Sequence, residues 1–165
     1  MGGIINEVGA NSRMVDRRPN MPYFTARDSS GGQTVAHSTY THSTAMTVSV
    51  DTHNAWSSNT YTIPETGYYH IIGNSELYQS SNNIGGAKMS IEKTGSTLIG
   101  RYSWVTYSAG WQYPLVLRHI DVNVNTVEHC VAGTDNLKLY FEHMSGNGSS
   151  GSFQKTSFLV YKIGI

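Results

Sequence analysis

The stretch Asn59-Thr-Tyr-Thr-Ile-Pro-Glu-Thr-Gly-Tyr-Tyr-His-Ile-Ile-Gly-Asn-Ser-Glu-Leu-Tyr78 decides how this chain folds. A short strand is predicted at residues 60–63, and it ends at Pro64 because proline has no N–H to donate to a sheet. Gly67 can take the positive φ that a tight corner requires. Beyond the corner, β-branched and aromatic residues predict a long strand at residues 67–78. The unit is therefore a strand, a corner and a second strand.

The second strand carries apolar or aromatic side chains on both of its faces, because alternate residues of a strand point to opposite sides. The two sets are Tyr69, Ile71 and Leu77, and Tyr68, Ile72 and Tyr78. One β-sandwich buries only one face of each sheet. The pattern therefore predicts that the other face meets a second subunit. The alternative is that these tyrosines lie on an ordinary surface, which their amphipathic rings tolerate.

Strand-like alternation continues through most of the chain from residue 22 onward. Strands are predicted at residues 22–27, 44–51, 60–63, 67–78, 87–93, 97–105, 114–124, 126–132, 137–144 and 153–163. Breakers rich in Gly, Ser, Asn and Asp separate most of them, including residues 80–86, while Asn125 alone separates two. In the strand 137–144, four residues are expected to share a face: Leu137, Leu139, Phe141 and His143. With no sustained helical spacing, the pattern indicates an all-β sandwich or barrel.

Composition excludes several classes of protein. The 165 residues suit one domain, and 11 basic against 11 acidic side chains give a formal net charge of zero. Nucleic acid is not an expected partner, because binding it requires a basic face. The single cysteine, Cys130, excludes an intrachain disulfide and is predicted to be a small core residue. Apolar runs are too short to cross a bilayer and no secretory signal is recognisable, so we expect a protein made in the cytoplasm, without membrane insertion.

Residues 1–21 lack sustained periodicity and are predicted to form an extended N-terminal arm, with a head domain at residues 22–165. The arm is expected to contact a partner chain by adding a strand to its sheet or by threading along it. Its apolar side chains and its arginines, whose planar guanidinium groups bind carboxylates and carbonyls, are the residues that would do so: Ile4, Ile5, Val8, Arg13, Arg17 and Arg18. The alternative is a disordered leader.

The opening stretch resembles the signature of the complement C1q globular head, one of the tumour-necrosis-factor-like jelly rolls. That signature has an aromatic residue, five further residues and then Gly-x-Tyr-x-Phe. Tyr61, Gly67 and Tyr69 occupy the matching positions. Ile71 replaces the phenylalanine, and Gly73 stands where an aromatic residue is usual.

The flanking segments carry the same resemblance with departures. Asp51 and Trp56 match an upstream pair, but the interval from Trp56 to Tyr61 is two residues shorter than expected. Residues 158–161, Phe-Leu-Val-Tyr, resemble the closing strand of the family, whereas residues 155–157 lack the expected Phe-Ser-Gly.

The resemblance covers residues 22–165 and implies a jelly-roll β-sandwich of about ten antiparallel strands that forms a homotrimer. It implies that side chains of the central and terminal strands form the trimer interface: Tyr61, Tyr69, Ile71, Phe158 and Tyr161. A short arm replaces the signal peptide and collagen-like stalk of extracellular members. This arrangement resembles bacteriophage structural proteins such as capsid decoration or cement proteins, head fibres and tail-fibre tips. The implied function is a non-enzymatic virion protein, located in the virion and attached to capsid or fibre and tail subunits through its arm.

No catalytic or metal-binding motif accompanies this resemblance. The seven histidines form no His-Glu-x-x-His or comparable spacing, and the acidic residues are too scattered for paired carboxylates or a calcium loop. There is no Gly-x-Ser-x-Gly elbow. We expect no enzyme activity, no cofactor and no metal; the alternative left open is an ion on the trimer axis near His37 and His42.

A last candidate site is an aromatic loop. Trp104, Tyr107, Trp111 and Tyr113 surround a Ser-Ala-Gly turn, and exposed aromatic clusters stack on sugar rings or fill a partner's pocket. Core packing or a place in the trimer interface would explain them equally well. They motivate the alternative function, a receptor- or glycan-binding module that contacts a host-surface glycan.

Overall fold

The computed structural model describes residues 21–28, 31–44, 46–80, 84–94, 97–99, 119–145 and 148–165. Across these ranges the secondary structure is entirely β. The strands are β1 (Tyr23–Asp28), β2 (Gln33–Val35), β3 (Tyr40–His42), β4 (Met46–Asp51), β5 (Trp56–Ser57), β6 (Thr60–Thr62), β7 (Gly67–Tyr78), β8 (Ile84–Lys93), β9 (Thr97–Ile99), β10 (His119–Cys130), β11 (Asn136–Ser145) and β12 (Gly151–Gly164).

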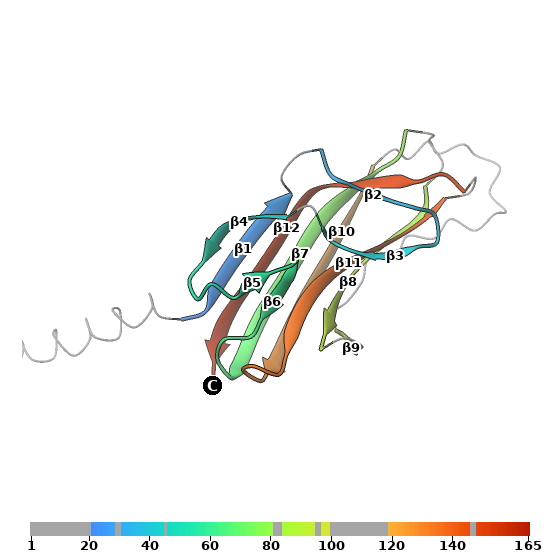
Figure 1. Ribbon diagram of the computed structural model, residues 1–165. Coiled ribbons are helices and arrows are strands. Elements are labelled where there is room, and N and C mark those ends of the chain that lie inside the picture. The colour runs from blue at the N-terminus through green and yellow to red at the C-terminus, as the bar shows by residue number, and fades with distance from the viewer. Residues whose placement is uncertain are drawn as a thin grey trace, which may run out of the picture.

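The strands form two antiparallel sheets packed face to face as a sandwich (Figure 1). The first sheet has the order β10-β7-β12-β1-β4, with β2 also paired to β12. The second has the order β5-β6-β11-β8-β9, with β3 also paired to β11. The first and last strands of the head, β1 and β12, are neighbours, so the chain crosses between the sheets rather than meandering. This is the connectivity of a jelly roll, and the expected fold class is confirmed.

The core lies between the sheets and is built from the inward residues of alternating strands. Leu137, Leu139, Phe141 and His143 of β11 are all buried, which confirms that they share a face. Phe141 stacks on Phe153 of β12 with ring centroids 4.4 Å apart, and this pair joins the two sheets. Full burial of each such aromatic ring contributes about 1.5–3 kcal/mol to stability.

The corner before β7 forms as the sequence predicts. Gly67 has a φ of 154°, and a Cβ atom there would lie 2.3 Å from the carbonyl oxygen of Gly164, so only glycine fits without a backbone shift. Tyr69 is buried, and its hydroxyl donates a hydrogen bond to the carbonyl oxygen of Glu65, 2.7 Å away. The aromatic residue after the glycine therefore fastens the corner to the strand that leaves it.

Gly73 explains one departure from the family signature. It faces the core from the middle of β7, and a Cβ atom there would lie 2.9 Å from side-chain atoms of Leu139, Met89 and Val124. These three buried side chains fill the space that an aromatic residue would otherwise need. The missing side chain of Gly73 is thus compensated by larger side chains that pack around it.

Several predicted boundaries are wrong. β10 runs unbroken through Asn125, because this residue points outward and its side chain is hydrogen-bonded on the sheet surface. β8 begins at Ile84, inside the predicted breaker 80–86. The two- and three-residue strands β2, β3 and β5 were not predicted, since such short segments carry too little alternation to detect. The part of the predicted strand 97–105 beyond Ile99 lies outside the described residues.

The edge strand β4 departs from regular pairing. Its register with β1 shifts between Thr25 and Ala26, which marks a β-bulge. Val48 and Val50 remain 38% and 42% exposed. This strand therefore lies at the margin of the sandwich rather than over its core.

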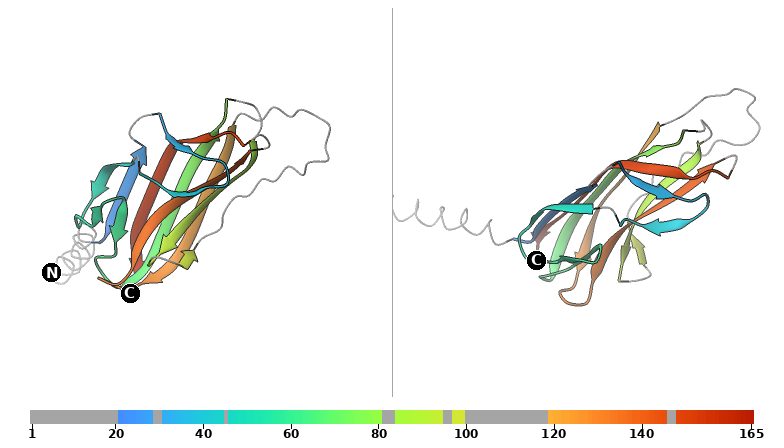
Figure 2. Two further views of the ribbon diagram at one scale, coloured as in Figure 1. Left: turned by 45° about the vertical axis from the view of Figure 1, so that its right-hand side comes forward. Right: turned by 45° about the horizontal axis from the view of Figure 1, so that its top comes forward.

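The C-terminus lies at the same end of the sandwich as the start of β1 (Figure 2), consistent with the pairing of Tyr23 with Tyr161. We call this end the base. Among the residues that the structure describes, no helix is long and apolar enough to span a membrane.

Candidate functional site

The face of the first sheet that points away from the core carries a row of aromatic and apolar side chains. Cross-strand pairing places Tyr23 of β1 beside Tyr161 of β12, Tyr161 beside His70 of β7, and His70 beside Val127 of β10. Tyr23 is 40% exposed and Val127 is 51% exposed. Four neighbouring strands therefore contribute one continuous row, which no other part of the described chain covers. We call this side of the sheet the outer face.

His70 sits in the middle of the row and is held on both sides. Its Nδ1 lies 2.5 Å from the Tyr161 hydroxyl, and its Nε2 lies 2.5 Å from Oδ1 of Asn125. An amide oxygen only accepts hydrogen bonds, so Nε2 carries the proton and Nδ1 accepts from the tyrosine when the ring is neutral. The three side chains, from β12, β7 and β10, fix one another's rotamers.

Further apolar side chains lie on the outer face on either side of this row, along the direction of the strands. In the next row, Leu159 pairs with Ile72, and both are partly buried. Toward the base, Tyr68 is 46% exposed and meets the ring of His129 edge-on, with centroids 5.1 Å apart. The lower half of the outer face is thus an apolar and aromatic surface.

The other half of the outer face is polar and charged. Glu76 of β7 is bonded to Nδ1 of His119 and accepts a 2.7 Å hydrogen bond from Nζ of Lys155. These contacts, the lysine first, lower the pKa of Glu76 and outweigh the opposing effect of burial. Asp121 stands directly opposite Glu76 on β10. A shallow pocket of 210 Å³ opens between them, and Asn74 and Asn123 also line it.

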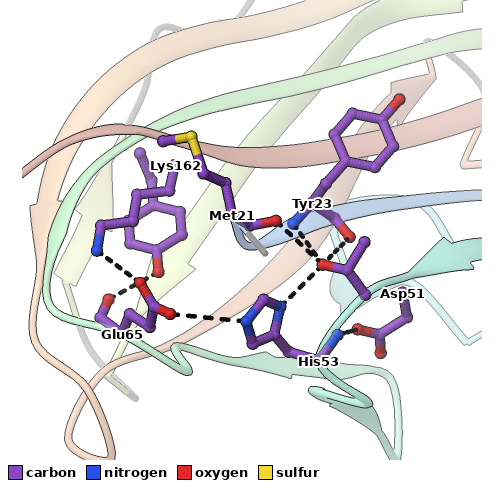
Figure 3. A network of polar contacts seen from close by, with 8 residues as sticks. Met21, Tyr23, Asp51, His53, Glu65 and Lys162 are labelled. Carbon is purple, nitrogen blue, oxygen red and sulfur yellow. Dashed lines mark hydrogen bonds and ion pairs between the residues drawn. The ribbon is translucent and has the colours of Figure 1, made fainter. Parts of the chain in front are cut away.

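A separate polar network fixes the base of the sandwich, where the described chain begins (Figure 3). The Thr52 hydroxyl donates to the carbonyl oxygen of Met21, 3.2 Å away, and accepts a 3.0 Å bond from the backbone N–H of Tyr23. It also lies 2.8 Å from Nδ1 of His53. The turn after β4 therefore holds the segment that leads into β1.

The same network reaches the corner and the last strand. His53 Nε2 lies 3.7 Å from one carboxylate oxygen of Glu65, and Lys162 Nζ donates a 2.8 Å hydrogen bond to the other. The hydrogen bond from Lys162 is the main reason that the pKa of Glu65 is lowered. Because Glu65 belongs to the corner and Lys162 to β12, the network ties three distant segments together at the base.

The predicted trimer interface is wrong for four of its five residues. Tyr61, Tyr69, Ile71 and Phe158 are 0% exposed and pack between the two sheets. A side chain enclosed by its own subunit has no surface to offer another one. Only Tyr161, on the outer face, remains available to a partner. An interface on this sheet would instead use the outward residues that alternate with the predicted ones.

The other predicted contact residues cannot be placed. The arm residues Ile4, Ile5, Val8, Arg13, Arg17 and Arg18, and the loop residues Trp104, Tyr107, Trp111 and Tyr113, lie outside the described residues. Their roles in partner and glycan binding stay predictions.

The described histidines are dispersed, and in this part of the chain no three His, Cys, Asp or Glu side chains come together as a metal site. His37 accepts a 2.9 Å hydrogen bond at Nδ1 from the backbone N–H of Ser145. The backbone oxygen of His42 accepts one from Gln33. Cys130 is buried as predicted, and burial raises the pKa of its thiol to about 11, which keeps it protonated and unreactive at neutral pH.

His143 has an environment that the sequence did not reveal. Its ring is fully buried beside Gly151, and neither ring nitrogen has a hydrogen-bond partner among the described residues. Burial, with a smaller contribution from His37, lowers its pKa. This is therefore a neutral imidazole enclosed in the core.

Comparison with known structures places this arrangement of strands among the tumour-necrosis-factor- and C1q-like jelly rolls. The chain is similar to Eiger TNF from S. frugiperda (TM-score 0.59, 12% identity, 87% of this chain and 92% of that chain). It is also similar to the globular domain of zebrafish complement 1qA (TM-score 0.53, 14% identity, 87% and 97%) and to murine APRIL at pH 8.5 (TM-score 0.57, 9% identity, 87% and 99%). Identities this low establish the fold alone. No protein-family model and no curated protein matches the sequence.

Proposed function

We propose that this chain is the head of a non-enzymatic structural protein of a bacteriophage virion. It acts as a homotrimer, with an N-terminal arm at residues 1–21 that attaches it to capsid, fibre or tail subunits. The observation that carries the proposal is the row of aromatic and apolar side chains on the outer face, Tyr23, Tyr161, His70 and Val127, which the described part of the subunit leaves uncovered. The neutral, disulfide-free composition supports a protein packed at high density beside copies of itself.

The outer face is large enough to form a stable interface. β7, β10 and β12 have 12, 12 and 14 residues, whereas β1 and β4 have six each. At about 3.3 Å per residue and about 4.8 Å between strands, each residue covers about 16 Å² of the sheet. The five strands together give a face of about 790 Å², close to the roughly 800 Å² that each partner contributes to a standard protein interface. Its apolar and aromatic half resembles the core of such interfaces, and its polar, charged half resembles their rim.

Sedimentation velocity on the purified protein tests the self-association. We expect a species of three 18.1 kDa chains near neutral pH. Val127→Arg should convert it to a monomer, because the change places a charge in this row, beside His70. Val131→Arg is the matched control: this valine is 41% exposed but lies in the turn beyond β10, outside the outer face. A monomeric wild type, or equal effects of the two variants, would contradict the proposal.

The virion role requires a second experiment. Deletion of residues 1–20 should leave a folded trimer, because the first strand begins at Tyr23 and the Thr52 network holds Met21 and Tyr23 in place. Binding of the truncated protein to purified virions should be lost. Retained binding would contradict attachment through the arm, whereas a truncated monomer would show that the arm contributes to the trimer instead.

A further inference from the structure

We infer that self-association through the outer face is switched by pH: the copies associate near neutral pH and separate as the histidines of this face become protonated. The inference rests on the proposed function, since it concerns the regulation of the same surface. It follows from where three histidines lie, from what each contacts, and from the balance of the fixed charges around them.

The three histidines are placed together by strand register. His119 and His129 lie near opposite ends of β10 at outward positions. They pair with Tyr78 and Tyr68 of β7, and His70 lies between them on β7 itself. The outer face therefore carries two imidazoles, His70 and His129, in its apolar lower half and one, His119, in its polar half. Histidine is the side chain whose charge ordinarily changes between pH 5 and 8.

His70 is the member whose protonation alters the apolar row. The groups that face it are the Tyr161 hydroxyl on β12 and the Asn125 amide and Val127 on β10, and none of these is ionised near neutral pH. In the neutral ring, Nδ1 accepts the tyrosine proton. When Nδ1 gains a proton it becomes a donor, so the Tyr161 hydroxyl must turn to accept it and direct its own hydrogen away from the ring. A positive charge and a reoriented donor then face the neighbouring copy.

The two outer histidines have different surroundings. His129 contacts the Tyr68 ring edge-on, and its backbone oxygen accepts a 2.8 Å hydrogen bond from Lys93. Asp135 is the carboxylate that interacts with it electrostatically. Across this end of the face no carboxylate is bonded to the His129 ring in the described structure. Protonation therefore adds a charge beside an exposed aromatic side chain.

His119 is bonded to the Glu76 carboxylate and packs against the Tyr78 ring, with centroids 5.0 Å apart. Lys155 shares the same carboxylate, and Asp121 follows on the same strand as His119. Because the pKa of Glu76 is lowered, this carboxylate stays ionised in mild acid. The change of charge between neutral pH and mild acid is then confined to the imidazole.

Among the described residues, the fixed charges on the outer face cancel. Arg27 and Lys155 are its cations, and Glu76 and Asp121 are its carboxylates, all at outward positions of the first sheet. Neutral histidines therefore leave this part of the face without net charge, and protonated ones make it positive. Every copy in a homotrimer carries the same face, so protonation adds positive charge to all the surfaces that come together.

Linkage gives the sign of the effect: protons that bind the separated copies more readily than the assembly weaken association. With such groups in every copy, we expect the apparent dissociation constant to rise by at least about tenfold between pH 7.5 and pH 5.5, and a tenfold change corresponds to about 1.4 kcal/mol. Asn125 and Tyr161 hold His70 in the interface in either state, so the effect comes from charge rather than from loss of structure.

Sedimentation velocity over a concentration series at pH 7.5 and pH 5.5 tests this inference. We expect the wild type to dissociate at least about tenfold more readily at pH 5.5, and His70→Gln combined with His119→Gln and His129→Gln to lose most of that dependence. His37→Gln combined with His42→Gln, which lie off the outer face, is the matched control and should keep it. Near-ultraviolet circular dichroism verifies folding at both pH values, and a parallel series carries His143→Leu to remove the buried imidazole.

The outcomes separate the two claims. A wild type that is monomeric at both pH values refutes the proposed self-association itself. A wild type that associates equally at both values, or a triple variant that dissociates in acid like the wild type, refutes the pH switch while leaving the association intact. If the pH dependence disappears only in the His143→Leu series, acid unfolding caused the dissociation and the switch is likewise refuted.

Discussion

Replacing His143 with leucine should make the protein more stable, and increasingly so as the pH falls. The imidazole is fully buried, and in the part of the chain that the structure describes neither ring nitrogen has a hydrogen-bond partner. Leucine has a similar volume and no polar atom to desolvate. Each unsatisfied buried polar group costs about 1–3 kcal/mol, so removal of the ring should raise the free energy of unfolding by about that amount at pH 7.5. His143→Gln, which keeps polar atoms without a titrating group, is the matched control.

The pH dependence has a definite sign. Burial lowers the pKa of His143 in the folded protein, while in the unfolded chain histidine titrates near pH 6.5. Below pH 6.5 the unfolded state therefore binds a proton that the folded state does not. Each further pH unit costs the wild type about 1.4 kcal/mol, until the folded pKa is reached. The loss relative to the leucine variant therefore begins near pH 6.5 and grows as the pH falls toward the folded pKa.

Urea unfolding followed by tryptophan fluorescence measures this difference. Trp56 is a suitable probe because it stacks on the buried Phe24, with ring centroids 4.8 Å apart. The protein concentration is held constant, since association adds to apparent stability. The difference in unfolding free energy between wild type and His143→Leu should widen from pH 7.5 to pH 4.5. Curves that stay parallel over this range would refute the reasoning, because they would mean that the buried ring is protonated as readily as a free one.

Two further predictions concern the core and a turn. Gly73→Ala should lower the unfolding free energy by about 1–3 kcal/mol through overpacking, since the new Cβ would lie 2.9 Å from three core side chains. Gly164→Ala is the control and should be neutral in the same urea assay, because a Cβ at this position would have no atom within 4 Å. Asp135→Asn should cost about 1–3 kcal/mol at pH 7, because the carboxylate accepts hydrogen bonds from the Thr94 hydroxyl and the Val131 N–H. Burial alone would raise the Asp135 pKa, but these bonds together with the charges of Lys93 and His129 lower it. The wild-type advantage is therefore present above the ordinary aspartate pKa and should shrink as the pH falls through the lowered one. An advantage that is constant with pH would contradict this account.

The sequence predicted the elements whose signals are local. β7 has the predicted bounds because alternation over 12 residues is unambiguous. The corner at Gly67 and the shared face of Leu137 and Phe141 follow from equally local rules. Burial of Cys130 follows from the behaviour of lone cysteines. These features need no knowledge of which strands pair.

The candidate surface was harder to predict because it depends on long-range register. Alternation along β7 separates Tyr68 from Tyr69 but does not say which of them faces the core. Tyr69 is the one that faces the core, where its hydroxyl donates a hydrogen bond to the carbonyl oxygen of Glu65 in the corner. The contact between His70 and Tyr161 joins residues 91 positions apart. A contact between residues so far apart in the chain leaves no pattern that a single sequence reveals. The same holds for the buried His143 ring, whose nitrogens have no hydrogen-bond partner among the described residues.

The β-bulge between β1 and β4 bears on how copies of this protein avoid aggregating. A straight edge strand exposes a row of free N–H and C=O groups that can template another strand, and so start a fibril. Here Thr25 pairs with Val50 and Ala26 with Val48, so the bulge leaves Ser49 as an extra residue in the edge strand β4 itself. The same distortion hinders edge-to-edge addition of strands from further copies, a mode of assembly that can continue without limit. In the proposed homotrimer, by contrast, packing through the outer face closes after three subunits, which would direct a crowded population of these molecules toward finite assemblies.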